Sequence, residues 1–135
     1  MTDVHHVLIV EDDPAMAEEL RRLVDGLGFT ADIVDNQHDA ISAVSRRSFC
    51  LILLDLSIKT RPDSIAGHTE AGFAVLADVR KRWPSLVDGS RFHQFPVIVV
   101  SGHVRDSDDG FRALEAGADE VLPKPLNEKR GTPAE

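Results

Sequence analysis

Four short apolar runs constrain the fold of this chain more than any other feature. They lie at residues 7–10, 51–54, 97–100 and 121–122. Apolar runs with few polar interruptions are typical of strands buried on both faces, as in a parallel sheet that helices cover on either side. The runs therefore predict a parallel sheet at the centre of the molecule.

Each run ends at a group suited to phosphate or metal chemistry. Three acids follow the first run, one acid follows the second, a serine follows the third, and a lysine and a proline follow the fourth. These residues are Glu11, Asp12, Asp13, Asp55, Ser101, Lys124 and Pro125. Ligands of such sheets bind at the carboxyl ends of the strands. We therefore expect these side chains, far apart in the sequence, to converge on one small site.

The composition is that of one globular domain. A length of 135 residues, 42% hydrophobic and 28% charged, is enough for a buried core. The 23 acidic side chains outnumber the 15 basic ones, and the net charge of −8 would repel a polyanion such as DNA. We expect no direct binding to nucleic acid.

The location expected from the sequence is the cytoplasm. No apolar stretch has the length of a membrane span, and Met1-Thr2-Asp3 does not resemble a signal region. The single cysteine, Cys50, cannot form an internal disulfide, and we expect it to be a small core residue in a reducing compartment. No contact with a membrane is expected.

Helical and strand patterns alternate along the chain. Asp13 can cap a helix that begins at Pro14 and ends before Gly28. Further helices are predicted at 39–47, around 73–83 and through 111–117, strands at 29–34 and 118–122, and a loop at 56–68. This alternation predicts an α/β fold with a doubly wound parallel sheet.

The converging groups suit the transfer of a phosphoryl group to a carboxylate. Asp55 at the end of its strand can act as the nucleophile and form an acyl phosphate. Glu11 and Asp12, with the backbone carbonyl of Ser57, would share a magnesium or manganese ion with Asp55. Lys124 and the Ser101 hydroxyl would bind phosphoryl oxygens, as cation and donor.

Four segments together resemble the receiver domain of two-component response regulators. They are Val-Leu-Ile-Val-Glu-Asp-Asp-Pro (7–14), Leu-Ile-Leu-Leu-Asp-Leu (51–56), Pro-Val-Ile-Val-Val-Ser-Gly (96–102) and Ala-Leu-Glu-Ala-Gly-Ala-Asp-Glu-Val-Leu-Pro-Lys-Pro-Leu (113–126). The resemblance implies a flavodoxin-like, doubly wound sheet of five parallel strands in the order 2-1-3-4-5. We expect a receiver domain at 1–126 and a short tail at 127–135.

The same resemblance implies a role for each site residue. Asp55 would accept the phosphoryl group from the phosphohistidine of a sensor histidine kinase or a histidine phosphotransfer protein. Glu11 and Asp12 would be the metal acids, Ser101 the hydroxyl switch residue, and Lys124 the phosphate-binding lysine, aimed by a cis Lys124–Pro125 bond. We also count Gly102, next to Ser101, among the phosphate-binding residues.

The chain departs from the family pattern around this site. Val121 stands where the family commonly has a switch aromatic, and the chain has no tyrosine. The loop after Asp55 is longer than usual and lacks the usual proline; it could gate access, bind a partner or be a tolerated insertion. His103, two residues after Ser101, could overhang the phosphoryl group and influence attacking water, so Ser101, His103 and Val121 are the switch candidates.

The segment after Lys124 is also unusual. The family normally ends in an amphipathic helix, but residues 126–135 contain Gly131 and Pro133 and little that is apolar. The final helix is therefore expected to be short or absent, or the sequence stops before it. If it is absent, part of the first helix and the sheet lies bare, and a homodimer or tight complex through that face is expected.

Three functions remain open from the sequence. The first is a phospho-accepting receiver that signals to a downstream protein, as a stand-alone regulator, a relay intermediate or a part of a larger protein. It would not be an enzyme beyond its own metal-dependent phosphorylation and dephosphorylation. The second is a pseudo-receiver, an interaction module that does not depend on phosphorylation. The third, a metal-dependent phosphohydrolase, would need a carboxylate where Ser57 stands.

Overall fold

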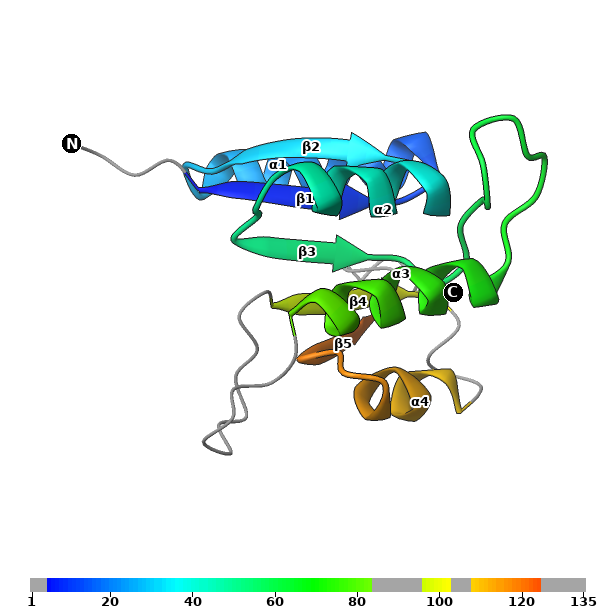
Figure 1. Cartoon of the computed structure of the whole chain (residues 1–135). Coiled ribbons are helices and arrows are strands. Elements are labelled where there is room, and N and C mark those ends of the chain that lie inside the picture. Colours follow the sequence, from blue (N-terminus) through cyan, green and yellow to red (C-terminus); the bar gives the residue numbers. More distant parts are fainter. Residues whose placement is uncertain (1–4, 84–95, 103–107, 125–135) are drawn as a thin grey trace, which may run out of the picture.

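The computed structural model describes residues 5–83, 96–102 and 108–124. One sheet holds five parallel strands in the order β2-β1-β3-β4-β5, which confirms the predicted doubly wound, flavodoxin-like fold (Figure 1). The strands are β1 (His6–Val10), β2 (Thr30–Val34), β3 (Leu51–Leu54), β4 (Val97–Ser101) and β5 (Glu120–Pro123). The helices are α1 (Pro14–Gly26), α2 (Gln37–Arg46), α3 (Thr69–Arg82) and α4 (Asp109–Glu115).

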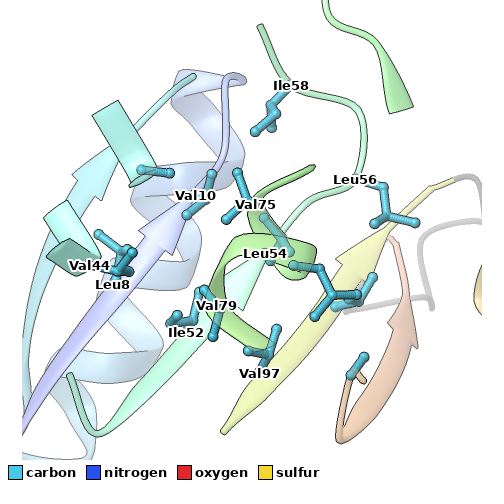
Figure 2. Close-up of a cluster of buried hydrophobic side chains, with 14 of the residues drawn as sticks. Leu8, Val10, Val44, Ile52, Leu54, Leu56, Ile58, Val75, Val79 and Val97 are labelled. Atoms are coloured by element: carbon cyan, nitrogen blue, oxygen red, sulfur yellow. The ribbon is translucent and has the colours of Figure 1, made fainter. Parts of the chain in front are cut away.

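Helices cover both faces of the sheet, and each face has its own apolar cluster. In β1, Leu8 and Val10 point to the face that α2 and α3 cover, whereas Val7 and Ile9 point to the face that α1 covers. Figure 2 shows the larger cluster, in which strand and helix side chains meet between the layers. The two-sided burial explains why β1 is apolar throughout, because alternate side chains of a central strand face different helices.

The register of the sheet brings the strand ends together. Val10 at the end of β1 pairs with Leu54 at the end of β3, and Ser101 at the end of β4 pairs with Pro123 on β5. The residues that follow these strands therefore lie at one edge of the sheet. The predicted convergence of the polar groups follows directly from this register.

Side-chain caps define where the first two helices begin. Asp13 accepts a hydrogen bond from the Ala15 N–H at 3.1 Å, and Pro14 is the first residue of α1, as predicted. α2 begins at Gln37, two residues before the predicted start. The reason is Asn36, which is buried and accepts a hydrogen bond from the Asp39 N–H at 2.8 Å.

The loop between β3 and α3 is attached to the N-terminus of α2. The Gln37 and His38 N–H groups donate to the carbonyls of Lys59 and Thr60 at 2.8 and 3.0 Å. Ile58 forms an isolated bridge with His68, which closes the base of the loop. Figure 1 shows the loop extending beyond the carboxyl ends of the strands, so it rises beside the predicted site.

One expectation about a single residue needs correction. Cys50 is exposed rather than part of the core, because it precedes β3; its sulfur lies 3.2 Å from His5 Nδ1. The apolar residues Leu23 on α1 and Leu27 just after it are also 53% and 70% exposed. Only Ala17, Leu20 and Val24 of that helix are buried.

Several expectations fall outside the described residues. These are the final helix, the Lys124–Pro125 bond, the boundary at residue 126 and the position of His103. Strand β5 lies at Glu120–Pro123, slightly later than predicted. Among the helices of the described ranges, none combines the length and apolar character needed to cross a bilayer.

Candidate functional site

Three carboxylates gather at the carboxyl ends of β1 and β3. Glu11 and Asp12 directly follow β1, and Asp55 directly follows β3. One oxygen from each of the three lies within 4.8 Å of the others. Glu11 and Asp55 are buried, at 2% and 5% exposure, and Asp12 is half-buried. The three acids thus converge on one site, as the strand-end pattern predicts, and two of them are buried.

Lys124 is the cation of this cluster. Its Nζ lies 2.7 Å from Glu11 Oε1 and 3.0 Å from Asp55 Oδ2. The Lys124 N–H donates to the Ser101 carbonyl at 3.2 Å, which ties the end of β5 to the end of β4. A lysine two strands away from Asp55 therefore reaches the acids because β4 and β5 end at the same edge.

The protonation of the cluster reflects its burial. Desolvation, then the nearby Asp55 carboxylate, raises the pKa of Glu11 from 4.5 to about 8. Desolvation and Asp55 also raise the pKa of Asp12. Burial of Lys124 lowers the pKa of its ammonium group, but the Glu11 and Asp55 carboxylates raise it by more, so the pKa of Lys124 is raised. Burial and the neighbouring carboxylate therefore disfavour the charged forms of Glu11 and Asp12, which a cation in the cluster would favour.

The donor set fits a divalent cation. The ligand atoms would all be carboxylate oxygens, the kind that Mg²⁺ and Mn²⁺ prefer. Glu11 Oε1 is fully buried and lies 2.7 Å from Lys124 Nζ. Three carboxylates this close together, with burial and mutual repulsion raising the pKa of Glu11 and Asp12, are suited to a bound cation.

The chain around Asp55 supports its orientation. The Ser57 N–H donates to Asp55 Oδ1 at 3.2 Å, while Asp55 Oδ2 faces Lys124. The two oxygens of Asp55 are therefore in different surroundings, one held by the backbone and one beside a cation. The predicted use of the Ser57 carbonyl as a metal ligand stays a prediction.

The remaining predicted residues differ in how near they come to the acids. Ser101 is fully buried at the end of β4, between the strands that carry Asp55 and Lys124. Gly102 follows it and is exposed. Asp13 caps α1 rather than joining the acid cluster. Val121 lies on β5 and packs against the larger apolar cluster, so it belongs to the core of the α3 face.

Two residues near the site were not among those predicted. Lys59 lies at the end of the strand next to β1, where its Nζ is 3.6 Å from Asp35 Oδ2. Gly67 lies against Asp12, since a Cβ atom there would be 2.8 Å from Asp12 Oδ2. The unusual length of the loop after β3 was the only sequence signal for these two residues. Its length alone does not indicate that the loop approaches the acids that follow β1.

Comparison with known families agrees with this geometry. A family model described as "Response regulator receiver domain" matches residues 7–133. The chain belongs to this family. The five-stranded sheet agrees with this family, whose members are the receiver domains of two-component systems.

Individual receiver proteins are similar over most of this chain. It is 32% identical over 121 residues to the KDP operon transcriptional regulatory protein KdpE of Escherichia coli, covering 90% of this chain and 45% of KdpE. A receiver domain structure from Methylobacillus flagellatus is 30% identical with a TM-score of 0.65, covering 93% of this chain and 90% of that one. The chain spans less than half the length of the curated relatives it matches.

Proposed function

We propose that the domain accepts a phosphoryl group on Asp55 and signals through protein contacts. The observation that carries the proposal is the position of Asp55 Oδ2, 3.0 Å from Lys124 Nζ at the edge of a three-carboxylate cluster. A carboxylate beside a cation and a metal site is suited to attack phosphorus. The donor would be the phosphohistidine of a sensor histidine kinase or a histidine phosphotransfer protein.

The reaction divides between the residues of the site. An Asp55 oxygen forms the new O–P bond, the bond from phosphorus to the donor nitrogen breaks, and the electron pair of that bond leaves with the histidine. Glu11, Asp12 and Asp55 would hold Mg²⁺ or Mn²⁺, which offsets charge on the phosphoryl oxygens. Lys124 would exchange its contact with Asp55 for one with a phosphoryl oxygen, and Ser101 and Gly102 would bind another.

Two relatives of low identity support the chemistry. A Pseudomonas aeruginosa PA1611 receiver domain is described with a magnesium ion coordinated in its active-site cleft (22% identity, TM-score 0.66, 92% of this chain and 88% of that one). A Burkholderia pseudomallei response regulator is described with a phosphorylated aspartic acid and a calcium ion (22% identity, TM-score 0.69, 91% of this chain and 61% of that one). These descriptions concern those proteins; we extend them to Asp55 and to the acids around it.

The output is proposed to be a protein contact. Phosphorylation would add charge and acceptor oxygens that draw Lys124 and Ser101 together and change the surface around β5. The exposed Leu23 on α1, and Leu27 directly after it, are apolar surface that a second copy would bury in a homodimer. Sedimentation at micromolar concentration measures this; a monomer there would exclude the dimer.

Intact-protein mass spectrometry tests the phospho-acceptor proposal. The chain is incubated with acetyl phosphate, with and without magnesium, beside the variants Asp55→Asn and Asp63→Asn. Asp63 lies in the loop after β3 and serves as a matched control. We expect one added phosphoryl group that requires magnesium and is lost only in Asp55→Asn.

The alternative, a pseudo-receiver, predicts the opposite result. No adduct with acetyl phosphate, and none with phosphorylated kinases that label other receivers, would favour an interaction module independent of phosphorylation. An adduct that survives in Asp55→Asn would place the acceptor elsewhere and refute the assignment.

A further inference from the structure

The backbone of Lys59 is held in a defined position by the start of α2. Its carbonyl accepts the Gln37 N–H at 2.8 Å, and Lys59 forms an isolated parallel bridge with Asn36. Asn36 is itself fully buried and caps α2. Lys59 is thus attached to a rigid helix start, although it belongs to a long loop.

The side chain of Lys59 is also placed. Its Nζ lies 3.6 Å from Asp35 Oδ2, and only 26% of the side chain is exposed. Asp35 follows β2 just as Glu11 and Asp12 follow the neighbouring β1. Lys59 therefore lies on the β2 side of the acids, whereas Lys124 approaches them from β5.

The loop that carries Lys59 lies against the acid cluster at a second point. A Cβ atom at Gly67 would be 2.8 Å from Asp12 Oδ2 and about as close to the backbone of Ile58. Ile58, the residue before Lys59, is thus close to Asp12, because both lie against the same glycine. The loop is thus a wall of the site rather than a distant insertion.

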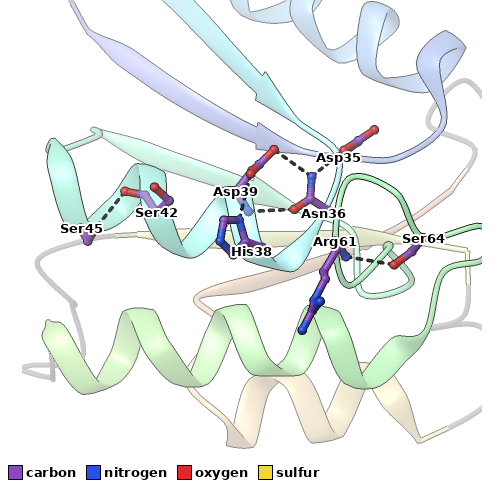
Figure 3. A network of polar contacts seen from close by, with 8 residues as sticks. All are labelled: Asp35, Asn36, His38, Asp39, Ser42, Ser45, Arg61 and Ser64. Atoms are coloured by element: carbon purple, nitrogen blue, oxygen red, sulfur yellow. Dashed lines mark hydrogen bonds and ion pairs between the residues drawn. The ribbon is translucent and has the colours of Figure 1, made fainter.

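Lys59 is not part of an anion site at the start of α2. The Gln37 and His38 N–H groups donate to loop carbonyls, and the Asp39 N–H donates to Asn36 Oδ1. Figure 3 shows the Asn36–Asp39 pair and the turn from Arg61 to Ser64 beside it. Those amides are therefore already bonded and leave no anion site for Lys59 to complete at the start of α2.

We propose that Lys59, held by Asp35, is a second cation of the site and sets how tightly Glu11, Asp12 and Asp55 bind a divalent ion. This rests on the metal site of the proposed function. A divalent ion entering the cluster is repelled by Lys59, and Asp35 limits that repulsion by holding the ammonium group. Without Asp35, Asp12 is a carboxylate that Lys59 can pair with in competition with the metal.

The test is titration with magnesium chloride by isothermal calorimetry at low ionic strength. Lys59→Met should bind magnesium roughly three- to ten-fold more tightly than the parent protein, and Asp35→Asn should bind it more weakly by a similar factor. Lys59→Met combined with Asp35→Asn should bind magnesium about as tightly as Lys59→Met alone, because Asp35 acts through Lys59. Lys59→Arg should retain the parent value. Electron paramagnetic resonance with manganese chloride gives an independent readout.

The control is Lys81→Met, which removes the same charge from the exposed C-terminal end of α3. That end lies away from the site, because α3 begins near the carboxyl ends of the strands and runs back along the sheet. We expect no change in Lys81→Met. Circular dichroism on each variant verifies folding, since Asp35 also accepts a hydrogen bond from Asn36 Nδ2.

The outcomes separate this proposal from the proposed function. An affinity in Lys59→Met equal to that of the parent and of Lys81→Met would overturn the role of Lys59 alone. Magnesium binding that follows the expected order without any phosphoryl adduct would refute phospho-acceptance and leave the role of Lys59 standing. A parent protein that binds neither magnesium nor manganese would overturn both.

Discussion

Glu11→Gln should stabilise the metal-free fold, although Glu11 is buried and lies 2.7 Å from Lys124 Nζ. Glu11 is 2% exposed, and its pKa is raised from 4.5 to about 8, first by desolvation and then by Asp55. Between these two pH values the folded state keeps a proton that the unfolded state has released. The free energy of unfolding therefore falls as the pH rises through this window.

The magnitude follows from the same two values. One pKa unit corresponds to about 1.4 kcal/mol, so ionisation of Glu11 in the unfolded chain costs the fold about 3 kcal/mol by pH 7. Glutamine has no such cost, but it changes the 2.7 Å contact between residue 11 and Lys124 Nζ. Lys124 retains Asp55 as a partner. We expect a net gain of about 2 kcal/mol at pH 8 and less than about 1 kcal/mol at pH 5.

Urea unfolding in the presence of EDTA measures the effect at pH 5, 6.5 and 8. Glu115→Gln is the control, because Glu115 is an exposed residue of α4. Its unfolding free energy should stay within about 0.5 kcal/mol of the parent at every pH. With saturating magnesium the order should reverse, since the parent gains binding energy that Glu11→Gln partly loses.

Two results would refute this reasoning. If Glu11→Gln were less stable than the parent at pH 8 without metal, the ion pair with Lys124 would outweigh the desolvation of Glu11. A stability difference that does not change with pH would mean that Glu11 titrates near its ordinary pKa in the folded protein.

The remaining predictions concern the framework of the site, and chemical denaturation measures each of them. Asp13→Ala should cost about 1 kcal/mol, because α1 loses its cap; an unchanged midpoint would contradict the capping role. Gly72→Ala should cost at least about 2 kcal/mol, since a Cβ there would overlap the backbone of Leu56. Arg80→Met should lower the free energy of unfolding by about 2–3 kcal/mol. The side chain of Arg80 is only 10% exposed and donates a hydrogen bond to Asp119 Oδ2 at 2.8 Å. A loss of stability no larger than that of an exposed arginine changed to methionine would refute this.

The sheet could be predicted from the sequence because its strands are buried on both faces. A strand such as Leu51–Leu54 has no polar side chain to conceal its limits, so the first polar residue after it marks its end. The residues at those ends were therefore predicted as a group. The start of α2 was less visible, although Asn36 followed by Asp39 is a capping pattern that could have indicated it.

Contacts made by the loop after β3 could not be predicted in the same way. The approach of Lys59 to Asp35, and of Gly67 to Asp12, depends on how the loop folds back over strands far from it in the sequence. The protonation of Glu11 is a similar case. Its identity and its position after β1 are visible in the sequence, but its pKa depends on burial and on a carboxylate more than forty residues away. Local pattern therefore identifies the ligands of this site, whereas their charge, and with it the affinity for a cation, is decided by tertiary packing.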